Sequence, residues 1–269
     1  MSIEKVYDNV VKHYSQDLSA HVLGSASKTA FDLLKEKKLS VESIFALGIG
    51  DGEQVIPYIE LYPKASVTGL DISSRMLEAA HQRLNCDTKH GDIAHAEDLV
   101  KPQKFDLAIA HFVCAYVEPD IVMQQAVKTL NDNGTLSIVS NTMQSFAKLL
   151  SYYHQYVEKD TYFRRHFKKH IEAAFATVHV PDSHQILLEQ CQKNNLDVLS
   201  EKSLKLEIRF ETVDEFHQFF MNAGWFASGL LHSKIAPKLI KFFFKWIAKK
   251  HLSFPFEDTL DISVVLARK

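Results

Sequence analysis

Apolar residues along this chain follow two different periods. Short apolar runs of strand length occur near residues 43–48, 66–71, 88–91, 105–112 and 134–140. Between them, apolar residues recur at steps of three and four, which is helical spacing, over about 53–61, 74–85 and 120–130. Alternation of strands and helices of this length predicts βαβ units and a parallel sheet. Right-handed crossovers then place a ligand crevice at the carboxyl ends of the strands.

The segments on either side of this alternation predict further elements. One apolar stripe predicts an N-terminal amphipathic helix through Ile3, Val6, Tyr7, Val10, Val11, Tyr14 and Leu18. A second helix is expected over about 27–38. Residues 142–195, rich in helix formers, aromatics and histidines, predict a helical cap above the crevice. Strand character resumes over 196–211, a helix follows from Val213 to Gly224, and the stretch 230–250 predicts one long helix or two short ones.

The first strand ends in three glycines at alternate positions, Gly48, Gly50 and Gly52, and the second strand ends in Asp71. Glycines at a strand end let a ligand approach the backbone. The following helix directs free N–H groups at that ligand, and a carboxylate that closes the next strand can bind a ribose diol. This pattern predicts a cofactor that contains a nucleoside.

The glycine spacing discriminates between such cofactors. A dinucleotide motif, G-x-G-x-x-G, needs glycine where this chain has Glu53. The G-x-G-x-G spacing instead resembles class I S-adenosylmethionine-dependent methyltransferases. Further stretches that resemble this family, in the same order, are 72–80, 90–93, 105–110, 130–136 and the final strand 261–268.

The resemblance implies a fold and a set of roles. The fold is a single α/β domain over 1–269: a doubly wound, mainly parallel, seven-stranded sheet with a C-terminal antiparallel strand and a helical cap at 142–195. The implied S-adenosylmethionine-binding residues are Tyr14, Gly48, Gly50, Gly52, Asp71, Ile72, Met76, Asp92, Ile93 and Ala110. Structural alternatives remain for several of them. Asp71 could cap a helix, Asp92 could form a turn, and Tyr14 could belong only to the apolar stripe.

One position departs from the family pattern. The family usually has Asp or Glu two residues before the first glycine, where it helps to hold the methionine amino group, and this chain has Ala46. Another residue could supply the contact, affinity could be reduced, or catalysis could have been lost. We favour the first explanation.

Candidate acceptor groups follow the fourth strand. His111 could be a general base, because its ordinary pKa lies near neutrality, or only a structural donor. Phe112 and Tyr116 could line the acceptor pocket. His166 and His170 lie four apart, as a metal pair would, but no third ligand is identifiable, so we predict no metal site.

Composition and charge make several functional classes less favourable. With 269 residues and a net charge of −2, the chain gives no overall electrostatic reason to expect a nucleic-acid partner. Three cysteines without a C-x-x-C motif argue against a disulfide framework or a zinc site. The N-terminus lacks an apolar signal core, so a cytoplasmic location is expected.

Five lysines recur at steps of three and four between Lys234 and Lys249, with apolar residues on the other helix faces. This pattern is typical of a membrane-surface helix and also of a helix packed on a sheet with its lysines outward. We favour packing and keep a peripheral membrane contact through 234–249 as an alternative.

The resulting hypothesis is methyl transfer from S-adenosylmethionine to a small-molecule acceptor. Two alternatives remain: methylation of a lipid-like or quinone-type substrate at a membrane surface, and a cofactor-binding interaction protein without catalysis.

Overall fold

The computed structural model describes residues 2–11, 17–157, 159, 178–222 and 237–269. In these ranges the strands form one seven-stranded sheet in the order β3-β2-β1-β4-β5-β7-β6. The strands are β1 (Ser43–Leu47), β2 (Ser66–Asp71), β3 (Asp87–His90), β4 (Phe105–His111), β5 (Leu130–Asn141), β6 (Asp197–Phe210) and β7 (Phe256–Arg268). Strands β1 to β5 pair in parallel, and β7 lies antiparallel between β5 and β6. The predicted fold class is confirmed.

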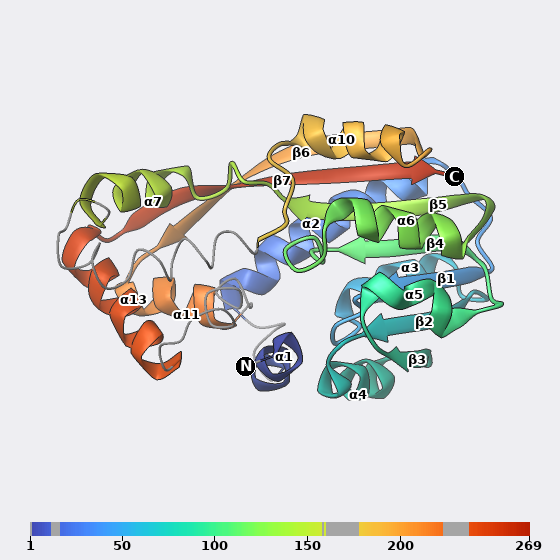
Figure 1. Ribbon diagram of the computed structural model, residues 1–269, viewed down its shortest axis with the longest axis horizontal. Coiled ribbons are helices and arrows are strands. Elements are labelled where there is room, and N and C mark those ends of the chain that lie inside the picture. Colours follow the sequence, from blue (N-terminus) through green and yellow to red (C-terminus); the bar gives the residue numbers. More distant parts are fainter. Residues whose placement is uncertain (1, 12–16, 158, 160–177, 223–236) are drawn as a thin grey trace.

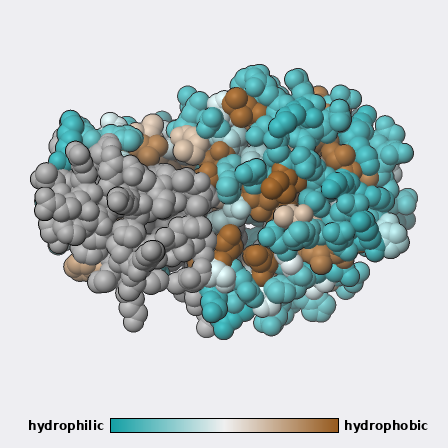
Figure 2. Space-filling model, viewed as in Figure 1, coloured by the Kyte–Doolittle hydropathy of each residue, from teal (hydrophilic) through white to brown (hydrophobic). Residues whose placement is uncertain are grey.

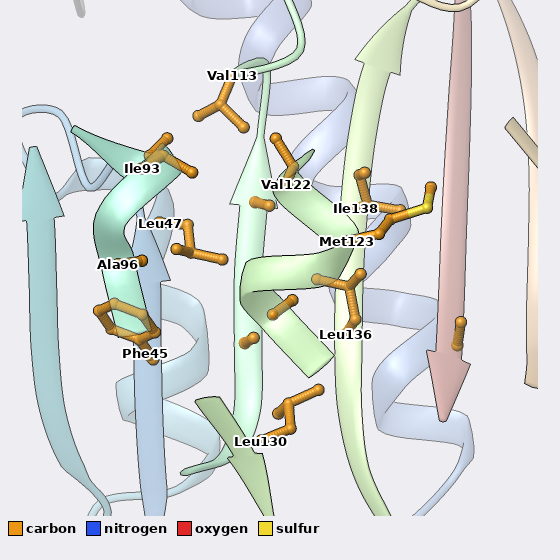
Figure 3. Close-up of a cluster of buried hydrophobic side chains, with 14 of the residues drawn as sticks. Phe45, Leu47, Ile93, Ala96, Val113, Val122, Met123, Leu130, Leu136 and Ile138 are labelled. Carbon is orange, nitrogen blue, oxygen red and sulfur yellow. The ribbon is translucent and has the colours of Figure 1, made fainter. Parts of the chain in front are cut away.

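Helices cover both faces of the sheet (Figure 1). One face carries α2 (Asp17–Glu36), the 3-10 helix η1 (Glu53–Val55), α3 (Ile56–Leu61) and α4 (Ser74–Arg83). The other face carries η2 (Ile93–His95), α5 (Ala96–Val100), α6 (Pro119–Thr129) and α10 (His184–Lys193). Because successive strand side chains point to opposite faces, Ile44 and Ala46 pack in the first layer and Phe45 and Leu47 in the second. Figure 3 shows part of the second core.

The two long strands β6 and β7 extend beyond the parallel sheet (Figure 1). Around this extension lie α7 (Ala147–Tyr152), α11 (Val213–Asn222) and α13 (Pro237–His251). Inward side chains of these helices and of the two strands form a third core that is rich in phenylalanine, including Phe210 of β6 and Phe216, Phe219 and Phe220 of α11. The final strand begins at Phe256, earlier than its sequence pattern indicates, because β6 pairs with it along almost its whole length.

The N-terminal helices differ from their prediction. The stripe from Ile3 to Leu18 does not form one helix, since α1 covers Ile3–Val10 and Leu18 belongs to α2. Helix α2 begins at Asp17 rather than near residue 27. A glycine inside a helix costs about 1 kcal/mol, but around Gly24 the buried side chains of Val22, Ala26 and Ala30 pack against the long strands. That packing extends the helix across the glycine.

The segment 142–195 is described only in part. Helix α7 packs against the far part of β7, where Asp258 accepts hydrogen bonds from the backbone amides of Lys148 and Leu149. Helix α10 belongs to the layer that covers the sheet, because Leu187 and Cys191 are buried in the second core. Half of the segment's eight phenylalanines and tyrosines lie outside the described residues, so a cap over the crevice stays a prediction.

Candidate functional site

The glycine loop follows β1 and has the backbone that the sequence predicts. Gly48, Gly50 and Gly52 have φ values of 74°, 57° and 82°, a region that side chains disfavour. The amides of Gly48 and Ile49 donate to the Leu70 carbonyl at 2.8 and 2.9 Å, which ties the loop to β2. A Cβ on Gly48 would lie 2.4 Å from the Val113 side chain. The loop therefore depends on the missing side chain at Gly48 for its close approach to Val113.

Asp71 closes β2 beside this loop. Its Oδ2 accepts from the Gly50 amide at 2.9 Å and its Oδ1 accepts from the Ser73 amide at 2.9 Å. Burial raises the pKa of Asp71, and these two backbone hydrogen bonds oppose the shift. Each carboxylate oxygen can accept a further hydrogen bond, so the carboxylate can hold the loop and still receive a ribose diol.

One pocket connects the loop with the carboxyl ends of β2, β3 and β4. It contains about 690 Å³ of empty space, counting the solvent at its mouth. Its lining residues are Ile3, Tyr7, Gly48, Gly50, Asp71, Ile72, Gly91, Asp92, Ile93, His111, Phe112, Val113, Tyr116 and Val117. Figure 2 shows hydrophobic residues grouped near the middle of one face of a surface that is otherwise largely hydrophilic.

Nine residues that the sequence predicts for the site line this pocket: Gly48, Gly50, Asp71, Ile72, Asp92, Ile93, His111, Phe112 and Tyr116. Three others do not. Gly52 forms the last turn of the loop, Met76 is a buried residue of α4, and Ala110 is buried in the second core. Tyr14 lies outside the described residues.

The adenine end of the predicted site is flanked by Ile72 and Ile93. Asp92 caps η2, since its Oδ1 accepts from the Ala94 amide at 2.9 Å. That contact leaves acceptor capacity on the carboxylate. A Cβ on Gly91 would lie 2.5 Å from a terminal methyl of Leu99, so that side chain would have to shift.

Helix α1 supplies two pocket residues that the sequence reasoning did not select, Ile3 and Tyr7. The helix is held to α4 by Asp8, whose Oδ1 accepts from the Ser73 hydroxyl at 2.7 Å. Arg75 donates to the Asp8 carbonyl at 3.1 Å. Tyr7 belongs to the same apolar stripe as Tyr14. The stripe pattern indicated that this segment could contribute a tyrosine to the site, but it did not indicate which tyrosine.

The wall opposite Asp71 is mostly apolar. It is formed by Phe112, Val113, Tyr116 and Val117 after β4. Phe112 has a φ of 58°, which is unusual for a side chain of this size, and its amide donates to the Val139 carbonyl at 2.7 Å. The rings of Tyr116 and Tyr7 meet edge to face with their centroids 5.5 Å apart. Burial raises the pKa of Tyr116 to about 12, and a hydrogen bond with Tyr7 partly opposes the shift.

His111 lies at the end of β4 with 7% of its surface exposed. Its Nδ1 is 3.3 Å from the Ser27 hydroxyl and its Nε2 is 3.0 Å from the Ser137 hydroxyl. The Ser27 hydroxyl also donates to Gln54 Oε1 at 3.0 Å. Because an amide oxygen only accepts, Ser27 then accepts from Nδ1–H, and Nε2 accepts from Ser137. This arrangement corresponds to a neutral imidazole with its proton on Nδ1.

Burial also lowers the pKa of His111 to about 3. An unfolded histidine titrates near pH 6.5, so below that pH the unfolded chain takes up a proton that the folded chain refuses. We therefore expect His111 to lower the free energy of unfolding by roughly 1 kcal/mol for each pH unit below 6.5. Urea unfolding between pH 7 and 4.5 should show a shallower pH dependence for His111→Gln than for the wild type. His95→Gln, at an exposed histidine, should leave the dependence unchanged, and equal slopes in all three proteins would contradict the assignment.

Ala46 occupies the position where the family pattern has an acid. It is 2% exposed and packs in the first core. Since β1 and β4 pair with Ala46 opposite Ile109, and strand side chains alternate, His111 lies on the same face of the sheet as Ala46. The neutral polar groups of Ser27, Gln54, His111 and Ser137 also lie on this face of the sheet.

Neither a metal-binding cluster nor a membrane-spanning helix is present in the ranges that the structure describes. Within them, no group of three or more His, Cys, Asp or Glu side chains could hold a metal ion. His166 and His170 lie outside them. The same ranges contain no helix of the length and apolar character that a bilayer span requires.

Comparison with solved structures agrees with this architecture. A protein of Bacillus halodurans superposes with a TM-score of 0.56 at 13% identity, over 90% of this chain and 99% of that one. The geranyl diphosphate C-methyltransferase of Streptomyces coelicolor superposes with a TM-score of 0.50 at 11% identity, over 90% and 77% of the two chains. At these identities the likeness concerns the fold.

Sequence comparison is more informative about the family. An uncharacterized protein of Rickettsia prowazekii is 32% identical over 110 residues, which is 37% of this chain. The aligned part is 19% of the relative, so the chain matches about a fifth of that protein's length. Residues 40–224, more than half of the chain, match the methyltransferase domain family. The chain therefore belongs to this family, and its fold is that of the class I S-adenosylmethionine-dependent methyltransferases.

Proposed function

We propose that this protein transfers a methyl group from S-adenosylmethionine to a small, predominantly apolar acceptor. The observation that carries the proposal is the continuity of one pocket. It runs from the glycine loop and Asp71 to the wall formed by Phe112, Tyr116 and Val117. A cofactor held by its ribose at Asp71 and an acceptor against this wall would share the same space.

In this proposal each end of the pocket has its own task. The cofactor supplies an electrophilic methyl group on a sulfonium. Gly48, Gly50 and Asp71 bind and orient it, and Ile72 and Ile93 enclose the adenine. Methyl transfer is an in-line displacement that depends mainly on closeness and alignment, so Phe112 and Tyr116 contribute by shaping the acceptor side and excluding water.

We propose a positioning role for His111 in place of the general base considered from the sequence. Both ring nitrogens are engaged with serine hydroxyls, and a conjugate acid with a pKa of about 3 makes a weak base at neutral pH. The anchored ring fixes the end of β4, from which the strained Phe112 and the acceptor wall continue. The Ser27, Gln54 and His111 network is also our candidate for the contact that Ala46 does not make.

The apolar character of the acceptor rests on the lining of the wall. A neighbour with the same fold is described as acting on geranyl diphosphate, so this architecture accommodates an acceptor with a hydrocarbon part in that protein. The non-catalytic alternative would need the space beside the sulfonium to be closed. The open pocket next to the glycine loop favours the enzyme.

To test this proposal, the protein is incubated with methyl-labelled S-adenosylmethionine and two panels of acceptors, and the label transferred to each compound is measured. One panel contains isoprenoid and phenolic compounds, and the other contains small amines and amino acids. We expect transfer to the apolar panel. Val117→Asp, which places a carboxylate on the acceptor wall, should raise KM for the best acceptor at least about tenfold. Its affinity for S-adenosylhomocysteine should change less than about threefold.

The control is Val127→Asp, the same change at a half-buried position on α6 outside the pocket. It should leave KM unchanged, and thermal unfolding of both variants shows whether each one folds. Transfer confined to the amines would overturn the apolar acceptor. Tight cofactor binding without transfer to either panel or to a cell extract would favour the non-catalytic alternative.

A further inference from the structure

Helix α13 presents a surface that the proposed methyl transfer does not use. Phe244 and Ala248 point into the third core. On the outward side, Phe242 is 63% exposed and Trp246 is 46% exposed. Among the residues whose burial is described, one further large apolar side chain is exposed, Met143 at 39%. The sequence pattern favoured burial of the apolar residues with only lysines outward, so these exposed aromatics differ from that expectation.

The two aromatics form a stripe with lysines beside it. Phe242 and Trp246 lie four residues apart and therefore share one side of the helix. Lys241, Lys245 and Lys249 follow the same step one residue earlier and are exposed. Lys250 places its Nζ 4.9 Å from the centre of the Trp246 ring. Apolar rings and cationic groups thus face solvent together along several turns.

The local charge contrasts with that of the whole protein. The helix carries five lysines and no acidic residue, whereas the chain as a whole has a net charge of −2. Lys245 pairs with Asp214 of the neighbouring helix α11, and the remaining lysines leave an excess of positive charge. At 15 residues, the helix is too short and too charged to cross a bilayer.

We propose that α13 binds the surface of an anionic phospholipid bilayer. Phenylalanine and tryptophan enter the boundary between headgroups and acyl chains, and lysines beside them interact with anionic headgroups. The helix would lie in the plane of the membrane, with its inward face still packed on Phe216 and Phe220. The residues that line the pocket lie between Ile3 and Val117, outside α13, so membrane binding does not depend on the proposed methyl transfer.

The first test is co-sedimentation of the full chain with vesicles of phosphatidylcholine containing 30% phosphatidylglycerol, compared with phosphatidylcholine alone. We expect binding only to the anionic vesicles, and weaker binding at higher salt. Each lysine near such a surface contributes about fivefold in affinity, so Lys241→Gln/Lys249→Gln should lose roughly 30-fold. Phe242→Ser/Trp246→Ser should lose at least roughly tenfold.

Matched controls change the same chemistry elsewhere. Lys202→Gln/Lys205→Gln removes two exposed lysines from β6, and Met143→Ser removes the other exposed apolar side chain. Both should bind like the wild type. In a Trp225→Phe background Trp246 is the only tryptophan, and its emission should shift to shorter wavelength on anionic vesicles.

Three results would overturn the proposal. One is failure to bind anionic vesicles, and another is binding that the α13 variants do not weaken. The third is binding to poly(U) RNA that is as tight as vesicle binding and is lost in the lysine variant but kept in the aromatic variant. That result would assign the surface to nucleic acid.

Discussion

Gly48→Ala is expected to weaken S-adenosylhomocysteine binding by more than a hundredfold. Gly48 has a φ of 74°, and a Cβ there would lie 2.4 Å from Val113 on the acceptor wall. The left-handed conformation alone costs an L-residue about 1–2 kcal/mol. The steric overlap adds to this cost and moves either the loop or the wall. Calorimetric titration of the purified variant measures the loss.

The matched control is Gly24→Ala. Gly24 lies on the exposed side of α2, and a Cβ there meets nothing within 4 Å. This variant should bind the ligand normally and unfold at equal or higher temperature, since alanine is favoured over glycine inside a helix by up to about 1 kcal/mol. Wild-type affinity in Gly48→Ala would contradict the assigned site. So would NAD binding to the wild type with an affinity similar to that of S-adenosylhomocysteine.

Asp71→Ala is expected to reduce both binding and stability. Loss of the hydrogen bonds from the ribose to a charged acceptor, about 1.5–3 kcal/mol, corresponds to roughly tenfold to over a hundredfold in affinity. Stability should fall as well, because the same carboxylate accepts from the amides of Gly50 and Ser73. Unpaired amides there should lower the free energy of unfolding by about 1–3 kcal/mol.

Two further variants separate these effects. Asp71→Asn keeps one acceptor oxygen but turns an NH₂ group toward a backbone amide, so it should rescue neither quantity fully. Asp98→Asn changes an exposed aspartate that pairs with Lys101 and should alter neither binding nor urea unfolding. If Asp71→Ala were as stable as the wild type and bound S-adenosylhomocysteine normally, Asp71 would have no role in the site.

The sequence predicted those parts of the site whose geometry is set by residues next to one another in the chain or on adjacent strands. A strand that ends in alternating glycines imposes its own loop, and a carboxylate at the end of the adjacent parallel strand must lie beside that loop. Parallel pairing of Leu47 with Leu70 brings the two ends together. For this reason Gly48, Gly50 and Asp71 could be placed from the sequence, together with the α/β architecture and the wall after β4.

The surroundings of His111 depend on contacts between distant segments. Its ring is held by Ser27 from α2 and Ser137 from β5, which are 84 and 26 residues away in the chain. No local pattern indicates such neighbours. Burial among them lowers the pKa of His111 and keeps its ring neutral.

The sequence by itself therefore determined the order of strands and helices, the glycine loop and the identity of its carboxylate, because these follow from periodicity and local backbone requirements. Tertiary packing decided the rest. It made Tyr7 of α1 a pocket residue, since Asp8 fixes that helix on Ser73. It also left Phe242 and Trp246 exposed, because α13 packs against α11 through its other side, where Phe244 contacts Phe216 and Phe220. A helical apolar pattern shows which residues share a face, but only the neighbouring elements determine which face is buried.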